Sequence, residues 1–171
     1  MKFMKTSRLW LFYLVSHLLP ETRFFGFKVR FLRWCGAQVG NNVRISSSAR
    51  FFGGGNLYIG DDVWIGSGNV IHAVSGATVK IGNCCDFGPG VMILTGSHKL
   101  DAHGSHIAGV GSVDNVEIGD GCWLGARSMI LPGLTLKKKT LVAAGSVVTQ
   151  SSPDEQSLIA GVPARFKRKI I

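Results

Sequence analysis

The residues of this chain that are best suited to chemistry are its five histidines, His17, His72, His98, His103 and His106. A neutral imidazole near pH 7 can accept a proton from an attacking hydroxyl or amine, so a well-placed histidine is a candidate general base. His98 is the best placed, because it ends a regular segment and opens a long irregular one. The alternative is a solvated histidine without a function. The sequence contains no Walker-type phosphate loop, Rossmann fingerprint or GxSxG elbow, which argues against the enzyme classes built on them.

The four cysteines, Cys35, Cys84, Cys85 and Cys122, match neither a zinc-ligand spacing nor a secreted disulfide framework. A disulfide between the adjacent Cys84 and Cys85 would be strained. We therefore expect packed free thiols in a protein of a reducing compartment.

The elements that must position these residues are predicted by a period of six. With 23 glycines and 17% charged residues, the composition fits a repeat protein and argues against a disordered chain. Between residues 39 and 148 an apolar residue returns every six positions, apart from short spacers and one long interruption. Fifteen positions share this pattern: Val39, Ile45, Phe51, Ile59, Ile65, Ile71, Ile81, Phe87, Ile93, Ile118, Leu124, Ile130, Leu136, Val142 and Val148.

This period matches neither the helical 3.6 nor simple strand alternation; it predicts coils of three short strands, about 18 residues each, with the apolar side chain inward. Following glycines predict tight corners that use positive φ, as at Gly40, Gly60, Gly66, Gly82, Gly88, Gly119 and Gly125. We expect an all-β fold in three parts. Residues 1–35 form an amphipathic helical segment, residues 36–157 form about five coils with a protruding loop at 99–115, and residues 158–171 form a short basic helix or tail.

The repeats carry phrases such as "IGDDVWIG", "IGNCCDFGPGV" and "IGDGCWLGARSMILPG". These resemble the hexapeptide-repeat acyltransferases, a resemblance that implies a left-handed parallel β-helix. The segment "LTGSHKLD" is similar to the catalytic segment of the galactoside and maltose O-acetyltransferase branch, which is also close to the surface-polysaccharide O-acetyltransferases. The resemblance implies that His98 is the catalytic base. This chain has one residue more between the Thr-Gly pair and the histidine than the galactoside enzymes have.

The same resemblance implies acetyl-CoA as the acyl donor, with no metal required. Matched by motif, "WLGA", "VAAGSVVTQ" and "GVPARFKR" provide the cofactor-binding candidates Ala126, Ala144, Thr149, Gln150, Arg165 and Arg168. Small residues admit a thin chain close to the backbone, and guanidinium groups bind phosphate through charge-assisted hydrogen bonds. The family often has lysine in place of Gln150. The alternative for the two arginines is an ordinary solvated basic tail.

On the acceptor side, the resemblance implies a sugar hydroxyl, in keeping with surface polysaccharide biosynthesis, and a homotrimer with sites at the subunit boundaries. Asp101 is a candidate to orient His98 or bind a sugar hydroxyl, and His72 a candidate to face the acceptor across a boundary. Trp123 is a candidate to wall the thioester. For all three, a structural or solvated role is the alternative. His103 and His106 belong to the protruding loop, either as part of a polar lid or in contact with the acceptor.

Three other functions stay open. The same base would serve N-acetylation of an amino sugar. A γ-type carbonic anhydrase uses three histidines between subunits to bind zinc, and His72, His98 and His103 are the available set. The third is a trimeric scaffold without enzymatic activity. We expect no nucleic-acid binding, because the aromatic residues are mixed with aliphatic ones rather than arranged as a stacking platform.

The net charge of +9 lies mainly at the two ends of the chain. Residues 1–35 carry seven Lys or Arg and one acid among many aromatic and aliphatic residues, and we expect helices over 6–19 and 22–34. The apolar run 9–19 is too short to span a bilayer, and no signal-peptide cleavage site follows it. These helices either lie on an anionic membrane surface or cap the β-helix and pack on protein. We expect a cytoplasmic protein, with peripheral contact at the inner face of the membrane in the first case.

Overall fold

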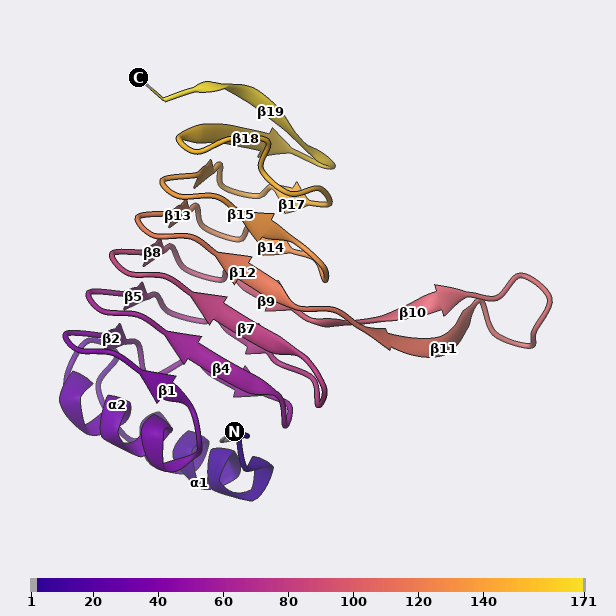
Figure 1. Ribbon diagram of the computed structural model, residues 1–171. Coiled ribbons are helices and arrows are strands. Elements are labelled where there is room, and N and C mark those ends of the chain that lie inside the picture. The colour runs from indigo at the N-terminus through magenta and orange to yellow at the C-terminus, as the bar shows by residue number, and fades with distance from the viewer. Residues whose placement is uncertain (1–2, 171) are drawn as a thin grey trace.

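The chain folds into a three-sided prism of stacked strands, with two helices at one end and a long hairpin projecting from its side (Figure 1). The computed structural model describes residues 3–170. Face A contains β1 (Gln38–Val39), β4 (Asn56–Ile59), β7 (Thr78–Ile81), β12 (Val116–Ile118) and β15 (Thr135–Leu136). Face B contains β2 (Arg44–Ile45), β5 (Trp64–Ile65), β8 (Asp86–Phe87), β13 (Trp123–Leu124), β16 (Leu141–Val142), β18 (Ser157–Gly161) and β19 (Ala164–Lys169). Face C contains β3 (Arg50–Phe52), β6 (Val70–His72), β9 (Met92–Leu94), β14 (Met129–Ile130) and β17 (Val147–Val148).

The chain visits the faces in the order A, B, C through corners AB, BC and CA, and then rises to the next coil. In Figure 1 the strands of face A lie nearest the viewer and run from right to left as the coil climbs, so the winding is left-handed. Successive coils pair as parallel strands in register: Ile59 lies beside Ile81, and Ile81 beside Ile118. The predicted left-handed parallel β-helix of about five coils is confirmed.

The six-residue period marks the inward side chains. All fifteen predicted positions are buried, with at most 8% of their surface exposed. Each buried aliphatic or aromatic side chain contributes roughly 1.5–3 kcal/mol relative to an exposed one. The column of apolar side chains along the axis is therefore the main source of the stability of the prism.

The glycines that follow the inward residues do not have the predicted positive φ. They are required instead by the close approach of neighbouring coils: a Cβ on Gly60 would lie 2.8 Å from the backbone nitrogen of Asn83. The left-handed conformation occurs two residues further on at corner AB, as at Asn42, Asp62 and Cys84. At this corner, therefore, the glycine is needed because a Cβ would collide with the next coil. The residue two positions later turns the chain with its positive φ.

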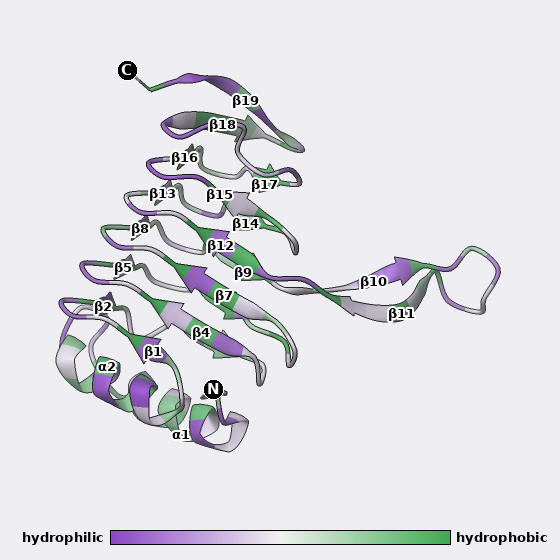
Figure 2. Cartoon of the chain, viewed as in Figure 1, coloured by the Kyte–Doolittle hydropathy of each residue, from purple (hydrophilic) through white to green (hydrophobic). Residues whose placement is uncertain are grey.

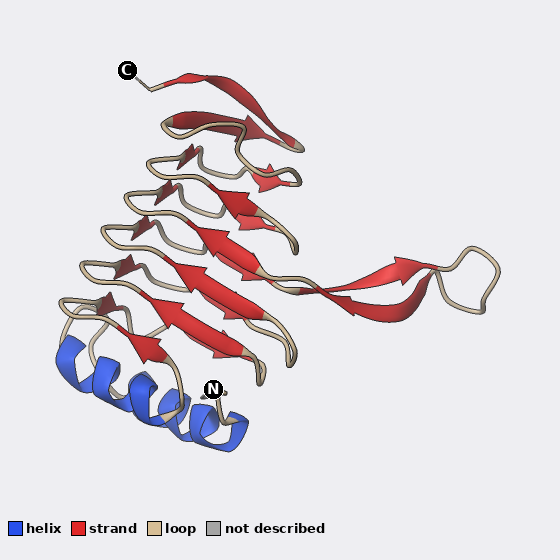
Figure 3. Cartoon of the chain, viewed as in Figure 1, coloured by secondary structure: helices blue, strands red, loops and turns tan. Residues whose placement is uncertain are grey.

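The N-terminal segment forms two helices, α1 (Thr6–His17) and α2 (Phe25–Trp34), close to the predicted ranges. They lie side by side across the open end of the first coil and form the cap (Figure 3). Phe12 of α1 packs edge-on against Phe31 of α2 and against Phe51 of the first coil. The buried Lys28 donates hydrogen bonds of 3.0 Å to the Ser47 hydroxyl and to the Glu21 carbonyl. Among residues 3–170, no helix has the length and apolar character needed to cross a membrane.

The C-terminal residues form strands, so the basic helix that we offered as one option for residues 158–171 is wrong for the part described, up to residue 170. β18 adds a parallel strand to face B, with Leu158 beside Leu141, and β19 folds back on it as an antiparallel edge strand. The exposed edge of face B offers unpaired backbone groups, whereas a short isolated helix is marginal in water. Arg and Lys side chains along β19 protect the new edge from pairing with another chain.

The predicted loop at residues 99–115 is largely an ordered antiparallel hairpin, which we call the arm. It consists of β10 (Gly96–Leu100), a tip at residues 101–107 and β11 (Ala108–Val113). The arm leaves the prism after β9, between faces C and A, and extends far from it (Figure 1). The sequence showed an interruption without a six-residue period, but not the pairing across it.

Candidate active site

His98 was expected at the end of a regular segment, but it lies on β10, three residues beyond the point where the chain leaves the prism. Thr95 fixes the base of the arm. Its hydroxyl donates to the His72 carbonyl at 2.9 Å and accepts from the Val74 amide at 2.8 Å. Its own carbonyl accepts from the Asp114 amide at 2.9 Å, across the two strands of the arm. The base of the arm is therefore well anchored, and it holds His98 outside the third coil.

The His98 ring is oriented by a backbone carbonyl. Its Nδ1 lies 2.8 Å from the carbonyl oxygen of Gly109 on the opposite strand. A carbonyl oxygen can only accept, so Nδ1 carries the proton and Nε2 keeps its free lone pair. The side chain is exposed, so Nε2 is accessible to a substrate. This is the tautomer and the exposure that a general base needs.

Asp101 does not orient His98, which was one of its two expected roles. Its Oδ1 accepts from the amides of His103 and Gly104, at 3.0 and 2.8 Å, and closes the turn at the arm tip. His103 and His106 lie exposed in the same tip. Sequence reasoning missed Gly109, because a residue that acts through its carbonyl has no side chain to reveal it.

The other two acceptor-side candidates lie on different faces of the prism. His72 ends β6 on face C, where its ring packs edge-on against Phe52 with centroids 6.2 Å apart. Trp123 begins β13 on face B and is more than half exposed. Within one chain, therefore, Trp123 and His98 do not face each other.

Of the cofactor-binding candidates, Ala126 and Ala144 meet at corner BC in successive coils. The Gly145 amide donates to the Ala126 carbonyl at 2.8 Å. A Cβ on Gly125 would lie 2.5 Å from the Ala144 nitrogen. Small side chains thus keep this corner narrow and its backbone accessible.

Thr149, Gln150 and Arg165 gather near corner CA at the C-terminal end. A guanidinium nitrogen of Arg165 lies 3.5 Å from the Thr149 hydroxyl, and it donates to the Ala164 carbonyl at 2.9 Å. Gln150 and Arg165 line an open cavity of about 320 Å³ together with Phe166. The structure places these three candidates together.

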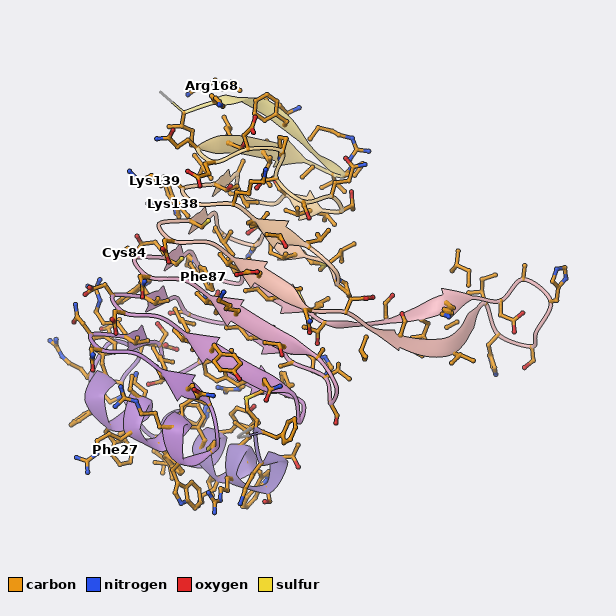
Figure 4. All side chains as sticks on the ribbon, viewed as in Figure 1. Phe27, Cys84, Phe87, Lys138, Lys139 and Arg168 are labelled. Atoms are coloured by element: carbon orange, nitrogen blue, oxygen red, sulfur yellow. The ribbon has the colours of Figure 1, made fainter. Side chains whose placement is uncertain are left out.

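Arg168 is separated from them. It lies toward the other end of β19, on the edge of the prism that also carries Lys138 and Lys139 and faces away from the arm (Figure 4). No motif in the sequence marked this lysine run as part of a basic edge. The C-terminal residues stack on the coil that carries these lysines. The Gln156 amide donates to the Lys138 carbonyl at 2.9 Å, and the Ile170 amide donates to the Gln156 carbonyl at 2.7 Å.

Comparison with known proteins agrees with this architecture. Residues 115–150 match the family described as "Hexapeptide repeat of succinyl-transferase". The galactoside O-acetyltransferase of Lactococcus lactis is 33% identical over 120 residues, which are 70% of this chain and 56% of the relative. The chain belongs to the hexapeptide-repeat family. A Saccharomyces cerevisiae protein named as a candidate acetyltransferase is 38% identical over 117 residues, 68% of this chain and 58% of the relative.

This hexapeptide-repeat chain thus spans somewhat over half the length of these curated relatives. Among solved structures, the hexapeptide-repeat acetyltransferase VCA0836 of Vibrio cholerae, complexed with acetyl coenzyme A, superposes with a TM-score of 0.66 at 23% identity. The match covers 96% of this chain and 86% of that protein, which shows that the two share a fold.

No three His, Cys, Asp or Glu side chains within residues 3–170 come together in a way that could hold a metal ion. The histidine triad of the carbonic anhydrase alternative is therefore not assembled in the described part of one chain. What one hexapeptide-repeat chain does present is an oriented imidazole on an arm, a narrow corner of small residues and a basic end.

Proposed function

We propose that the protein is an acetyl-CoA-dependent O-acetyltransferase that moves an acetyl group to a sugar hydroxyl. The observation that carries this proposal is the His98 ring, held by the Gly109 carbonyl with Nε2 free and exposed. The Lactococcus lactis relative is named galactoside O-acetyltransferase, and the Vibrio cholerae neighbour is complexed with acetyl coenzyme A. The first name fits a base that activates a hydroxyl, and the second fits acetyl-CoA as the acyl donor.

In the proposed step, Nε2 of His98 takes the proton of the acceptor hydroxyl while its oxygen attacks the thioester carbonyl. The Nδ1 hydrogen bond to Gly109 stays in place and stabilises the imidazolium that forms. Backbone amides would stabilise the oxyanion. The C–O bond forms, the C–S bond breaks, and the proton passes from Nε2 to the departing thiolate or to water. The step requires neither a metal nor a covalent enzyme intermediate.

For acetyl-CoA, we assign the thin pantetheine chain to corner BC, where Ala126 and Ala144 leave the backbone accessible. We assign the phosphates to Arg165, with Thr149 and Gln150 beside it at the open cavity. Arg168 lies three residues further along β19, toward the edge that carries Lys138 and Lys139. Its contribution would be to a separate phosphate or to the general positive field.

The proposed enzyme is a homotrimer with its sites at the subunit boundaries. In one chain the arm leaves between faces C and A, whereas Ala126 and Ala144 lie at corner BC. A second copy can bring its corner to the His98 of the first. The arm also exposes aliphatic side chains, Leu100 at 85% and Val110 at 78%, which a neighbouring subunit would cover. For location, we propose the cytoplasmic face of a membrane, held peripherally through residues 1–35.

The test is thiol release from acetyl-CoA across a panel of sugars, amino sugars and nucleotide sugars, with the product identified by NMR. Because Cys84 is exposed, it would also react with a thiol reagent, so the assay uses a Cys84→Ser background to keep the baseline low. We expect steady release with a hydroxyl acceptor, and a fall of about 10²–10⁴-fold in kcat for His98→Ala but not for His106→Ala. Transfer only to amines would favour the N-acetyltransferase, unchanged turnover in His98→Ala would remove the base assignment, and no transfer to any acceptor would favour the scaffold.

A further inference from the structure

The outer face of the cap is apolar and positively charged, and no part of the described chain covers it. We define this outer face by its exposed apolar and basic side chains and by the half-buried Arg8 beside them; the exposed members are Phe3, Lys5, Trp10, Leu11, Leu14, Leu18, Arg23, Phe24, Phe27, Arg30 and Trp34. Trp10 is 66% exposed and Leu18 is 79% exposed. A soluble surface rarely gathers so many large apolar groups in one place without a partner.

Helix α1 is apolar on two sides. Leu9 and Phe12 point into the prism and are buried, while Trp10, Leu14 and Leu18 recur every four residues on the opposite side. Hydrophobic and hydrophilic residues are mixed along both helices of the cap (Figure 2). A helix with apolar residues on two opposite sides normally buries both of them, in a core or against a membrane. The inner side of α1 has its core, and the outer side has none.

Arginine side chains surround the rings of this face. The Arg8 guanidinium lies 4.3 Å from the ring centroid of Trp34, and one of its nitrogens donates to the Trp34 carbonyl at 2.7 Å. Arg30 lines an open cavity on α2 together with Phe27 and Phe31. Aromatic rings with cationic groups beside them favour the boundary between lipid and water, where the ring is half immersed and the cation meets phosphate.

The face has no acid to neutralise these cations. The only carboxylate among residues 1–35 is Glu21, and it is directed toward the coils. Its Oε2 accepts from the Ser48 amide at 3.2 Å and from the Ser67 hydroxyl at 3.4 Å. Two copies of this face placed against each other would bring like charges together, which disfavours a second copy as the occupant. An anionic surface is favoured instead.

We propose that the outer face of the cap docks flat on an anionic phospholipid bilayer, and that the acceptor is a glycan carried on a lipid in that bilayer. The two helices lie side by side across the end of the prism, so a bilayer in contact with both lies across the prism axis (Figures 1 and 3). The prism then stands upright on the membrane. The statement about the acceptor rests on the proposed acetyltransferase function, whereas the docking does not.

The upright orientation sets the height of His98. The helix layer is about 10 Å thick and successive coils are about 4.8 Å apart. The arm leaves from the third coil, so His98 lies roughly 20 Å above the plane on which the cap rests. An acceptor hydroxyl on an extended saccharide reaches that height, and the first sugar attached to the lipid does not. In a trimer with its axis parallel to the prisms, three caps share one plane and bind with avidity.

The docking test is sedimentation of the full chain with vesicles of phosphatidylcholine, with and without phosphatidylglycerol. We expect binding only with the anionic lipid and weaker binding at high salt. Trp10→Ser/Leu14→Ser, and separately Arg23→Ser/Arg30→Ser, should each lower the partition coefficient at least tenfold. The matched control Lys138→Ser/Lys139→Ser removes the same charge from the other end and should change it less than twofold. Thermal melting shows that each variant is folded.

Failure of the wild type to bind anionic vesicles, or an equal loss in the lysine control, would overturn the docking. A change of oligomeric state in the Trp10→Ser/Leu14→Ser variant, without vesicle binding by the wild type, would assign the face to a protein contact. The acceptor statement is tested with lipid-linked saccharides of increasing length in vesicles, where we expect turnover only beyond the first sugars. Vesicle binding without acetyl transfer to any acceptor would contradict only the proposed function. Transfer to soluble sugars without vesicle binding would contradict only the docking.

Discussion

At the scale of single residues, the proposed chemistry depends on the carbonyl of Gly109. A Cβ at this position would lie 2.8 Å from the Cβ of Asp101 and 3.0 Å from the Lys99 carbonyl, so any larger residue pushes the two strands of the arm apart. The His98 ring would then lose its 2.8 Å acceptor. Gly109 is therefore a positioning residue, and its glycine is required by the close strands.

We expect Gly109→Ala to lower kcat by about 10–100-fold with the KM for acetyl-CoA unchanged, since orientation of the base is lost and the cofactor corner is not touched. The matched control is Gly111→Ala on the same strand, where an added Cβ would have its nearest neighbour, the Ser97 carbonyl, at 4.0 Å. Steady-state kinetics of the two variants make the comparison. Equal losses in both variants would mean that the carbonyl of Gly109 has no special role.

The four thiols differ in their environment, which predicts their reactivity. Cys84 is exposed, and the other three are buried. Burial raises the pKa of Cys35 to about 11, of Cys85 to about 12 and of Cys122 to about 11. The Sγ of Cys85 also donates to the Gly119 carbonyl at 3.2 Å. Because the thiolate is the reactive form, at pH 8 only about one in a thousand or fewer of these buried thiols is reactive.

In the native protein at pH 8, Ellman's reagent should therefore modify one thiol rapidly, and the Cys84→Ser variant should show none. Denaturant should release three more, because unfolding removes the burial that raises their pKa. Raising the pH toward 11 should speed the reaction of the buried thiols, as the thiolate fraction grows with pH below the raised pKa. Rapid native labelling of two or more thiols would contradict the packing of the prism core.

At the scale of elements, the corners determine how closely the coils can stack. Gly60 is required where a Cβ would meet the Asn83 nitrogen and the Gly82 carbon, both at 2.8 Å. We expect Gly60→Ala to lower the free energy of unfolding by about 1–3 kcal/mol or more, because the backbone of two coils must separate. Gly54→Ala is the control, since its added Cβ would meet nothing closer than 3.9 Å. Urea denaturation monitored by circular dichroism measures both, and a similar change in the two variants would count against stacking as the cause.

The side chains that follow these glycines explain the repeated Ile-Gly-Asp and Ile-Gly-Asn phrases. Oδ1 of Asp61 accepts from the Asn41 amide at 2.6 Å, that of Asn83 from the Asp61 amide at 2.8 Å, and that of Asp120 from the Asn83 amide at 2.7 Å. Each carboxamide or carboxylate thus links its coil to the one before it. The sequence showed this motif as a family signature, and the structure gives its physical reason.

Much of the prism could be predicted from the sequence because its information is local. One apolar residue in six is enough to identify the inward side, as with Ile65 and Ile93, and all the predicted positions are buried. The pairing of β19 and of the arm could not be predicted, because each strand depends on a partner edge that only the folded prism provides. For the candidate site, the histidine was visible in the sequence, whereas its orienting carbonyl depends on tertiary structure. The spacing of Arg165 and Arg168 follows from the strand that forms where a helix or tail was expected.

At the scale of the whole molecule, the arm is the feature that a single prism leaves unexplained. It extends beyond the prism with no described residue packed over Leu100 or Val110. A hairpin of this kind is only marginally stable by itself. Burial against a neighbouring subunit would provide roughly 1.5–3 kcal/mol for each aliphatic side chain. In the proposed trimer, the arm would therefore couple assembly to the position of His98.

The double variant Leu100→Ser/Val110→Ser should dissociate the proposed trimer at concentrations at which the wild type stays assembled, with an affinity at least 100-fold weaker. Sedimentation velocity over a range of protein concentrations measures this change. Acetyl transfer per chain should fall with dissociation and recover at high concentration, since the proposed site needs the corner of a second copy. The polar tip residue His106, changed to Ser, is the control and should alter neither property. A wild type that stays monomeric while active, or a variant that stays trimeric while inactive, would show that the arm serves His98 within its own chain.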